Sequence, residues 1–146
     1  MISANPGESL KPLAKIASGG EMSRIMLAIK SVLSDSDKVE TMIFDEIDTG
    51  VSGRAAQKIA EKMGMLAKKR QILCITHLAQ IAAMADRHYI IEKNSDEGST
   101  RTTVRPIEGE ERIQELARII GGVVVTELTL SAAREMLDMA EAYKNR

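Results

Sequence analysis

The chain has 146 residues, of which 44% are hydrophobic, and a formal net charge of −1. This length supports one ordinary hydrophobic core, so a single domain over residues 1–146 is expected. There is no Trp and only one Phe and two Tyr against nine Met, which argues against an aromatic platform for stacking nucleic-acid bases, and the near-zero charge argues against attraction of the whole domain to a polyanion.

Neither a membrane span nor an export signal is expected from the sequence. No apolar stretch approaches the ~20 residues needed to cross a bilayer, and no apolar signal core follows the N-terminus. The single Cys74 lies in the apolar run Ile-Leu-Cys-Ile, so it indicates a reduced core thiol rather than a disulfide framework or a catalytic nucleophile. The expected location is the cytoplasm, with no membrane partner.

The first half of the chain predicts a βαβ unit. Its expected elements are a loop or edge-strand remnant over residues 1–17, a helix from Ser18 to an interruption at Ser34 and Asp35, a strand at 41–44, a helix at 54–69 and a buried strand at 71–76. Apolar residues recur at helical spacing in both helices: Ile25, Met26, Ile29, Val32 and Leu33 in the first, and Ile59, Met63 and Leu66 in the second. A strand, a crossover helix and a second strand imply parallel pairing in a sheet covered on both faces.

The second half predicts a hairpin and further helices. Its expected elements are a short helix at 78–85, a strand at 88–93, a connection over Asn94–Ser99, a strand at 101–105, a helix at 108–120 ending at Gly121 and Gly122, and a last helix capped by Thr126 and running to about Tyr143. The predicted fold class is therefore α/β, with a mainly parallel sheet and flanking helices followed by a C-terminal hairpin and helices.

Three carboxylates follow the first predicted strand almost directly: Asp45, Glu46 and Asp48. Ligands of parallel sheets bind beyond the carboxyl ends of the strands, where Thr76 and His77 from the next strand are also expected. Hard oxygen ligands suit Mg²⁺ and a phosphoryl group. A hydrophobic run ending in Asp-Glu is the Walker B pattern, in which the first carboxylate binds the Mg²⁺ shell and the second orients or deprotonates the attacking water.

The sequence Ser18-Gly19-Gly20-Glu21 stands at the start of the first helix. A Ser N-cap and a Glu in the first turn are explained by helix capping alone, but capping does not require two consecutive glycines. Exposed backbone N–H groups beside a Ser hydroxyl form an anion site that a phosphate can approach closely. The other motifs also have simpler explanations, because Asp-Glu after a strand is often a polar loop and a lone His at a strand end is more often a hydrogen-bonding residue than a catalytic one.

The order and spacing of these motifs resemble the C-terminal half of an ABC-type ATPase head of the structural-maintenance-of-chromosomes (SMC) class. The strings that carry the resemblance are L-K-P-L-A-K-I-A-S-G-G-E-M-S-R-I-M-L-A, F-D-E-I-D-T-G-V-S-G-R and C-I-T-H-L-A-Q-I-A-A-M-A-D. They are most similar to bacterial DNA-repair members of that class, and the resemblance runs from about Asn5 to Met139.

The resemblance implies a role for each motif residue. It makes Ser18, Gly19, Gly20 and Glu21 the signature motif, which touches the nucleotide held by the opposing head. Asp45 is then the Mg²⁺-shell carboxylate, Glu46 the catalytic base, Asp48 a D-loop residue and His77 the switch histidine at the γ-phosphate. The implied cofactors are ATP and Mg²⁺, and the implied partners are a second head, with two ATP molecules sandwiched between the heads, and DNA at the nucleoid.

The phosphate-binding loop G-x-x-x-x-G-K-[ST] is absent from the chain. In the resembled family this Walker A loop lies in an N-terminal lobe, separated from these motifs by a long coiled coil, and no sustained heptad array is present here either. The chain is therefore expected to be the C-terminal lobe of a head, with the Walker A lobe as its partner. Alone, it is expected to bind ATP weakly and to hydrolyse it negligibly.

Two other functions remain open at the level of sequence. The first is a metal-dependent phosphohydrolase with ligands drawn from Asp45, Glu46, Asp48, Asp86 and either His77 or His88. The second is a non-catalytic dimerisation scaffold in which the Asp-Glu pair and the His only hold loops. A tight metal site without nucleotide would favour the first, and dimerisation without nucleotide would favour the second.

Overall fold

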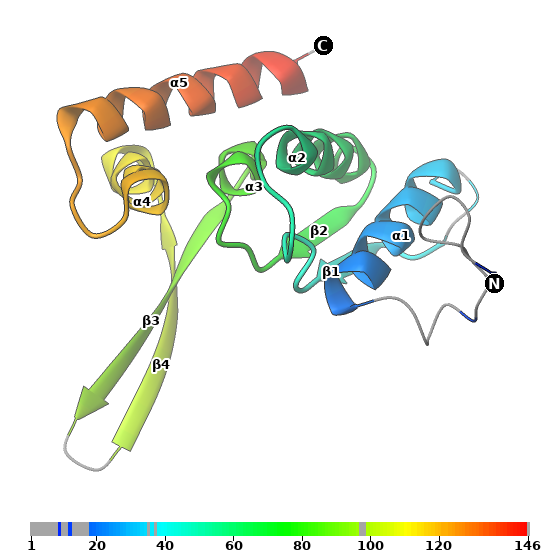
Figure 1. Ribbon diagram of the computed structural model, residues 1–146, viewed down its shortest axis with the longest axis horizontal. Helices are drawn as coiled ribbons and strands as arrows, with labels where there is room; N and C mark the ends of the chain where they lie inside the picture. The colour runs from blue at the N-terminus through cyan, green and yellow to red at the C-terminus, as the bar shows by residue number, and fades with distance from the viewer. Residues whose placement is uncertain are drawn as a thin grey trace. The chain divides into compact units, whose positions relative to one another are not determined.

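The computed structural model describes residues 18–34, 36, 38–96 and 99–145, together with Ser9 and Pro12. These residues form two compact units, Met1–Thr76 and His77–Arg146, and Figure 1 labels their helices and strands. The loop predicted over residues 1–17, apart from Ser9 and Pro12, lies outside the described residues, as does Asp35.

The first unit contains the predicted βαβ arrangement. Its elements are α1 (Gly19–Val32), β1 (Thr41–Phe44), α2 (Gly53–Ala67) and β2 (Gln71–Cys74). Strands β1 and β2 pair in parallel, with Thr41 opposite Gln71 and Phe44 opposite Cys74. Since a parallel pair needs a crossover connection, α2 supplies it, and the parallel βαβ prediction is confirmed.

Helix α2 has one buried apolar stripe, as its sequence periodicity predicts. Ile59, Met63 and Leu66 are all at least nine-tenths buried, and the small Ala56 and Ala60 on the same helix are fully buried. Residues at i, i+3, i+4 and i+7 share one face of a helix, so this stripe forms most of the core of the first unit.

One face of the parallel sheet is exposed, so the prediction that both faces are covered is wrong for the described residues. Met42 and Phe44 of β1 are buried, whereas Ile43 between them is 71% exposed. Leu73 and Ile75 at the second strand are also about half exposed. Successive side chains of a strand point to opposite faces, and the helices described in this unit leave the Ile43 face open.

Helix α1 forms as predicted, but its apolar stripe is not buried. Of its large apolar side chains only Leu27 is buried, whereas Met26 and Ile29 are more than one-third exposed and Val32 is 83% exposed. Apolar periodicity therefore predicted the helix correctly. It did not predict what would cover it.

The second unit consists of three helices and a long hairpin. Its elements are α3 (Ala79–Met84), β3 (His88–Asp96), β4 (Ser99–Ile107), α4 (Gly109–Gly121) and α5 (Glu127–Lys144). The core is made by fully buried residues of β4, α4 and α5: Ile107, Leu116, Ala117 and Ala133. Thr126 caps α5 by accepting a hydrogen bond from the backbone N–H of Thr129 at 3.3 Å, and α4 ends where Gly122 takes a φ of 81°, so both predicted helix boundaries are confirmed.

The hairpin is longer than predicted. Residues 94–96 continue β3 and residues 99–100 begin β4, so that Asn94 pairs with Arg101 and Asp96 with Ser99. The connection predicted over Asn94–Ser99 is therefore wrong at both ends, and only Glu97 and Gly98, which lie outside the described residues, separate the strands. Polar residues at a hairpin tip lack an apolar pattern, but their backbone groups still complete the antiparallel ladder.

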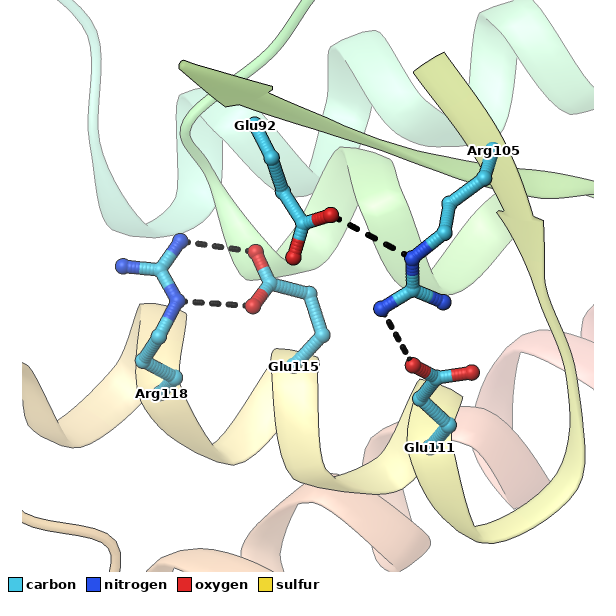
Figure 2. Close-up of polar contacts among 5 residues, drawn as sticks. All are labelled: Glu92, Arg105, Glu111, Glu115 and Arg118. Carbon is cyan, nitrogen blue, oxygen red and sulfur yellow. Dashed lines mark hydrogen bonds and ion pairs between the residues drawn. The ribbon is translucent and has the colours of Figure 1, made fainter. Parts of the chain in front are cut away.

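Charged contacts join the hairpin to α4 (Figure 2). Arg105 of β4 lies between Glu92 of β3, at 3.3 Å, and Glu111 of α4, at 2.6 Å. Glu115 and Arg118 form a separate pair with two hydrogen bonds of 2.7 Å within α4. The Arg105 pairs are substantially solvent-exposed, so they contribute little to stability and chiefly orient the hairpin relative to α4.

Arg112 joins α4 to the end of α3. Its Nη2 atom donates to the carbonyl oxygens of Ala83, at 3.0 Å, and Ala85, at 2.6 Å. The last carbonyls of a helix have no partner within the helix, so the half-buried guanidinium satisfies them. Burial lowers the pKa of Arg112, but the group remains a cation at neutral pH.

Replacing Leu116 by Ala should destabilise the chain much more than the same kind of change at Ile120. Leu116 is fully buried and Ile120 is 39% exposed, both on α4. We expect Leu116→Ala to lower the free energy of unfolding by about 2–5 kcal/mol and Ile120→Ala by less than ~1 kcal/mol, measured by urea denaturation. Equal losses for the two variants would contradict the assigned core.

Candidate functional site

The start of α1 is built as a capping box. The Ser18 hydroxyl accepts a hydrogen bond from the Glu21 backbone N–H at 3.3 Å, while the Glu21 carboxylate accepts from the Ser18 backbone N–H at 2.8 Å and from its hydroxyl at 3.0 Å. This reciprocal pair satisfies donors that a helix N-terminus otherwise leaves open. Ser18 is confirmed as the N-cap, and it is exposed to solvent.

The predicted carboxylates occupy the loop that follows β1. Asp45 and Glu46 are exposed, and Asp45 Oδ1 accepts the Glu46 backbone N–H at 2.9 Å. Glu46 has a φ of 57°, the only positive φ of a non-glycine residue within the described part of the chain. A non-glycine residue in this region is uncommon and strained, and such residues cluster at functional sites.

Asp48 is buried, unlike its two neighbours. It is only 3% exposed, and its Oδ2 atom accepts a hydrogen bond from the Thr76 hydroxyl at 2.6 Å. A buried carboxylate needs hydrogen-bond donors to offset the loss of water. Asp48 therefore ties the loop after β1 to Thr76, two residues beyond the end of β2, and it does not face solvent as Asp45 and Glu46 do.

The two glycines of the predicted signature motif lie against Glu46. A methyl group on Gly19 would collide with the Glu46 carboxylate, and one on Gly20 would lie 2.7 Å from the Glu46 carbonyl oxygen and 3.1 Å from Thr49 Cβ. Close backbone approach is a role that only glycine fills without displacement of its neighbour. The pair of glycines, which capping did not explain, thus allows the first turn of α1 to lie beside the loop of carboxylates.

Two residues that the sequence analysis did not single out hold this loop from α1. Ser23 Oγ donates to the Asp45 carbonyl at 2.9 Å, and Arg24 Nη1 donates to the carbonyls of Ile47 and Thr49 at 3.1 and 2.8 Å. Both residues lie one turn after Gly20, on the side of α1 that meets the loop. Polar residues on an otherwise apolar helix were the only signal of this role in the sequence.

The carboxylates of the loop affect the pKa of the neighbouring Cys74 thiol. Burial, followed by the charges of Asp48 and Asp45, raises the pKa of Cys74 to about 12. The thiolate needed for nucleophilic chemistry is thus scarce at neutral pH. Cys74 is half-buried and carries no disulfide, in agreement with its interpretation as a reduced thiol without a catalytic role.

The structure brings together most of the predicted site. The residues from Ser18 to Glu21 meet the loop from Asp45 to Asp48 within the first unit, through Gly19, Gly20 and the helix side chains. His77 follows Thr76 directly, is exposed and begins the second unit. The described residues therefore group the predicted signature sequence with the carboxylates of the predicted Walker B motif, and Asp45 offers exposed carboxylate oxygen of the kind that Mg²⁺ prefers.

The alternative metal centre gains no support from the geometry. Among the described residues, no group of three His, Cys, Asp or Glu side chains is close enough to hold a metal ion. His88, one of its candidate ligands, is half-buried, and burial and the nearby Arg112 lower its pKa.

The described helices include none long and apolar enough to cross a membrane.

Comparison with known proteins identifies close relatives of this chain. It is 54% identical to the DNA repair protein RecN of Halalkalibacterium halodurans over 98% of its length, and 54% identical to RecN of Bacillus subtilis over 99%. RecN of Treponema pallidum is 50% identical over 94%. The chain is homologous to a segment of RecN. It spans about a quarter of the length of these relatives, and the DNA-repair resemblance expected from the sequence is confirmed.

A solved structure shares the fold of this RecN segment. It comes from work on the structural biochemistry of ATP-driven dimerization and DNA stimulated activation of SMC ATPases. The TM-score is 0.52 at 23% sequence identity, with 81% of this chain and 70% of the solved chain covered. The predicted α/β fold of an ABC/SMC-type head is thereby confirmed. No protein-family model matches the chain.

Adding a methyl group at Gly20 should disturb the loop of carboxylates. In a helix, Ala is favoured over Gly by up to ~1 kcal/mol, but here the methyl group would meet the Glu46 carbonyl at 2.7 Å. We expect Gly20→Ala to lower the free energy of unfolding despite its better propensity and to shift the amide resonances of residues 46–49. A stabilised variant with unchanged resonances would show that the close approach is unimportant.

The capping box should weaken in acid. Hydrogen bonds from the Ser18 backbone and hydroxyl lower the pKa of Glu21 below its ordinary value of 4.5. Since the pKa is lower in the folded state, the box stabilises α1 at neutral pH and this stabilisation is lost as the pH falls through the folded pKa. Amide exchange at Glu21 should therefore accelerate below pH 4.5, measured by NMR relative to the intrinsic rate. Glu21→Gln is the matched control, and the same acid dependence in that variant would contradict the assignment.

Proposed function

We propose that this RecN segment is the signature and Walker B part of an ATP-binding and ATP-hydrolysing head in a DNA-repair protein that acts on double-strand breaks. The observation that carries the proposal is the contact of the glycine pair with Glu46, which brings a phosphate-binding helix start to the hydrolytic carboxylates. The RecN relatives are named as DNA repair proteins, and the structural neighbour concerns ATP-driven dimerization.

The proposal gives a role to each of the predicted site residues after β1 and β2. Asp45 would hold Mg²⁺ through its carboxylate, and the ion would neutralise phosphate charge. Glu46 accepts the proton of the attacking water, because it is a carboxylate at the loop surface with its backbone fixed by α1. Asp48 keeps the loop in register through Thr76. His77 supplies an imidazole donor to the γ-phosphate oxygen.

The signature residues act on a second nucleotide in this proposal. Ser18 and Gly19, at the start of α1, are exposed to solvent. They receive the γ-phosphate of the ATP bound by the opposing head, and the Ser18 hydroxyl then donates to phosphate oxygen instead of Glu21. Each reaction centre thus needs two heads, and dimerisation is part of catalysis. DNA is engaged by the intact dimer at the nucleoid, in the cytoplasm.

The remainder of each head is proposed to come from a Walker A lobe. This chain contains no phosphate-binding loop, and the exposed apolar face around Ile43, Leu73 and Ile75 offers the lobe a surface to cover. Burial of apolar area stabilises association by roughly 25 cal/mol per Å² before the costs of binding.

Complementation tests this proposal. The chain, mixed with a separately produced Walker A lobe of the Bacillus subtilis relative, should hydrolyse ATP, whereas the chain alone should not. Glu46→Gln and Ser18→Arg should each reduce the rate about 100-fold or more, and Lys62→Ala on the exposed side of α2 should leave it unchanged. Steady turnover by the chain alone that is sensitive to Glu46→Gln, or activity indifferent to both variants, would overturn the proposal.

Mixing the two inactive variants tests action across the dimer. A mixed dimer has one centre with an intact Glu46 from one chain and an intact Ser18 from the other. Random pairing should therefore restore about a quarter of the wild-type rate, since half of the dimers are mixed and one of their two centres is intact. A centre assembled within one chain would give no restoration. Nucleotide-independent dimers without activity would instead favour a scaffold.

A further inference from the structure

The backbone of the loop that carries Glu46 is held from α1 by three side-chain hydrogen bonds. Ser23 bonds the carbonyl before Glu46, at Asp45. Arg24 bonds the carbonyls of Ile47 and Thr49, which follow it. The three acceptors therefore bracket the proposed base on both sides, and both donor side chains come from one turn of the helix that begins with the predicted signature motif.

The loop conformation needs such support. Glu46 has a φ of 57°, which L-residues other than Gly, Asn and Asp seldom adopt because Cβ crowds the backbone. Within the loop, the Thr49 N–H donates to the Glu46 carbonyl at 3.0 Å and the Val51 N–H to Asp48 at 3.3 Å. These turn contacts fix its curvature, whereas the bonds from α1 fix its position.

We propose that Arg24, assisted by Ser23, is a positioning residue that couples the signature turn of a head to the catalytic base of the same head. The proposal rests on the function proposed above for Glu46. When a phosphate is received at Ser18, α1 moves or stiffens as one body, and the hydrogen bonds of Arg24 carry that change to the Ile47 and Thr49 carbonyls. Each head then senses the nucleotide of its partner before it hydrolyses its own.

The geometry of the Arg24 hydrogen bonds predicts how substitutions at this position should behave. One nitrogen, Nη1, donates to both carbonyl oxygens. A Lys ammonium offers several donors from one nitrogen, so Arg24→Lys should retain part of the contact. Arg24→Ala removes the contact and leaves two carbonyls to water.

The structural part of the proposal is tested on the chain by itself. Hydrogen exchange at the amides of Thr49 and Val51 should accelerate about tenfold or more in Arg24→Ala, because a charged hydrogen-bond donor has been lost. Ser23→Ala should give a smaller effect and Arg24→Lys an intermediate one. Arg101→Ala, which removes an exposed Arg from the hairpin, is the matched control and should leave both amides unchanged.

The functional part is tested with the chain complemented by the Walker A lobe. Arg24→Ala should lower kcat about tenfold or more while the KM for ATP stays within about twofold, and Arg24→Lys should recover much of kcat. A loss that arises only from unfolding would also lower the amount of complex and would not be rescued by Lys, so binding of the two parts is measured in parallel.

The outcomes separate this inference from the proposed function. Unchanged exchange at Thr49 and Val51 in Arg24→Ala overturns the inference, even if the complemented wild type is active. Accelerated exchange with an unchanged kcat also overturns it. If the complemented wild type has no ATPase activity, the proposed function fails together with the coupling to catalysis, and the exchange experiment still decides whether Arg24 holds the loop.

Discussion

The contact between the first turns of α1 and the loop after β1 determines the arrangement of the whole candidate site. Gly20 permits the backbone approach, and Ser23 and Arg24 convert it into hydrogen bonds with defined acceptors. Hydrogen bonds from a charged donor contribute about 1.5–3 kcal/mol when well shielded, and those of Arg24 are only partly shielded. That energy is of the same order as the strain of a single residue at positive φ. The unusual conformation of Glu46 is therefore stable where a free loop would relax.

This contact also explains why three carboxylates can lie within four positions. Asp48 turns inward to the Thr76 hydroxyl, whereas Asp45 and Glu46 turn outward to solvent. The inward residue fixes the loop to the segment just beyond the second strand of the parallel pair. The outward residues keep their charge in water, where like charges repel weakly. The loop therefore leaves two carboxylates, Asp45 and Glu46, accessible to solvent and one, Asp48, buried.

Sequence patterns predicted those parts of the fold that depend on local periodicity. The βαβ unit, the buried stripe of α2 and the caps at Ser18 and Thr126 follow from apolar spacing and capping chemistry, and the structure confirms them. The extent of the hairpin was missed, because a backbone ladder continues through polar residues without an apolar signal. The role of Arg24 was missed for a different reason. Its acceptors are backbone carbonyls more than 20 residues away, and a carbonyl has no signature in the sequence.

The exposed apolar faces of the first unit show the same limit of prediction: a local sequence pattern predicts a helix or strand, but it does not predict which distant residues will cover it. The periodicity of α1 is that of a helix packed on one side, yet Met26, Ile29 and Val32 are exposed, as is Ile43 on the sheet. Patches of this kind on soluble proteins mark surfaces that pack against other protein. The chain spans about a quarter of the length of its RecN relatives, and the proposed Walker A lobe would be one such partner. The contact between α1 and the loop of Glu46 differs from these apolar patches. It is polar, and all of its hydrogen bonds are formed within the first unit. A head assembled around this segment would therefore gain its phosphate cradle and much of its stability from outside, whereas the geometry of its catalytic loop would already be set from within.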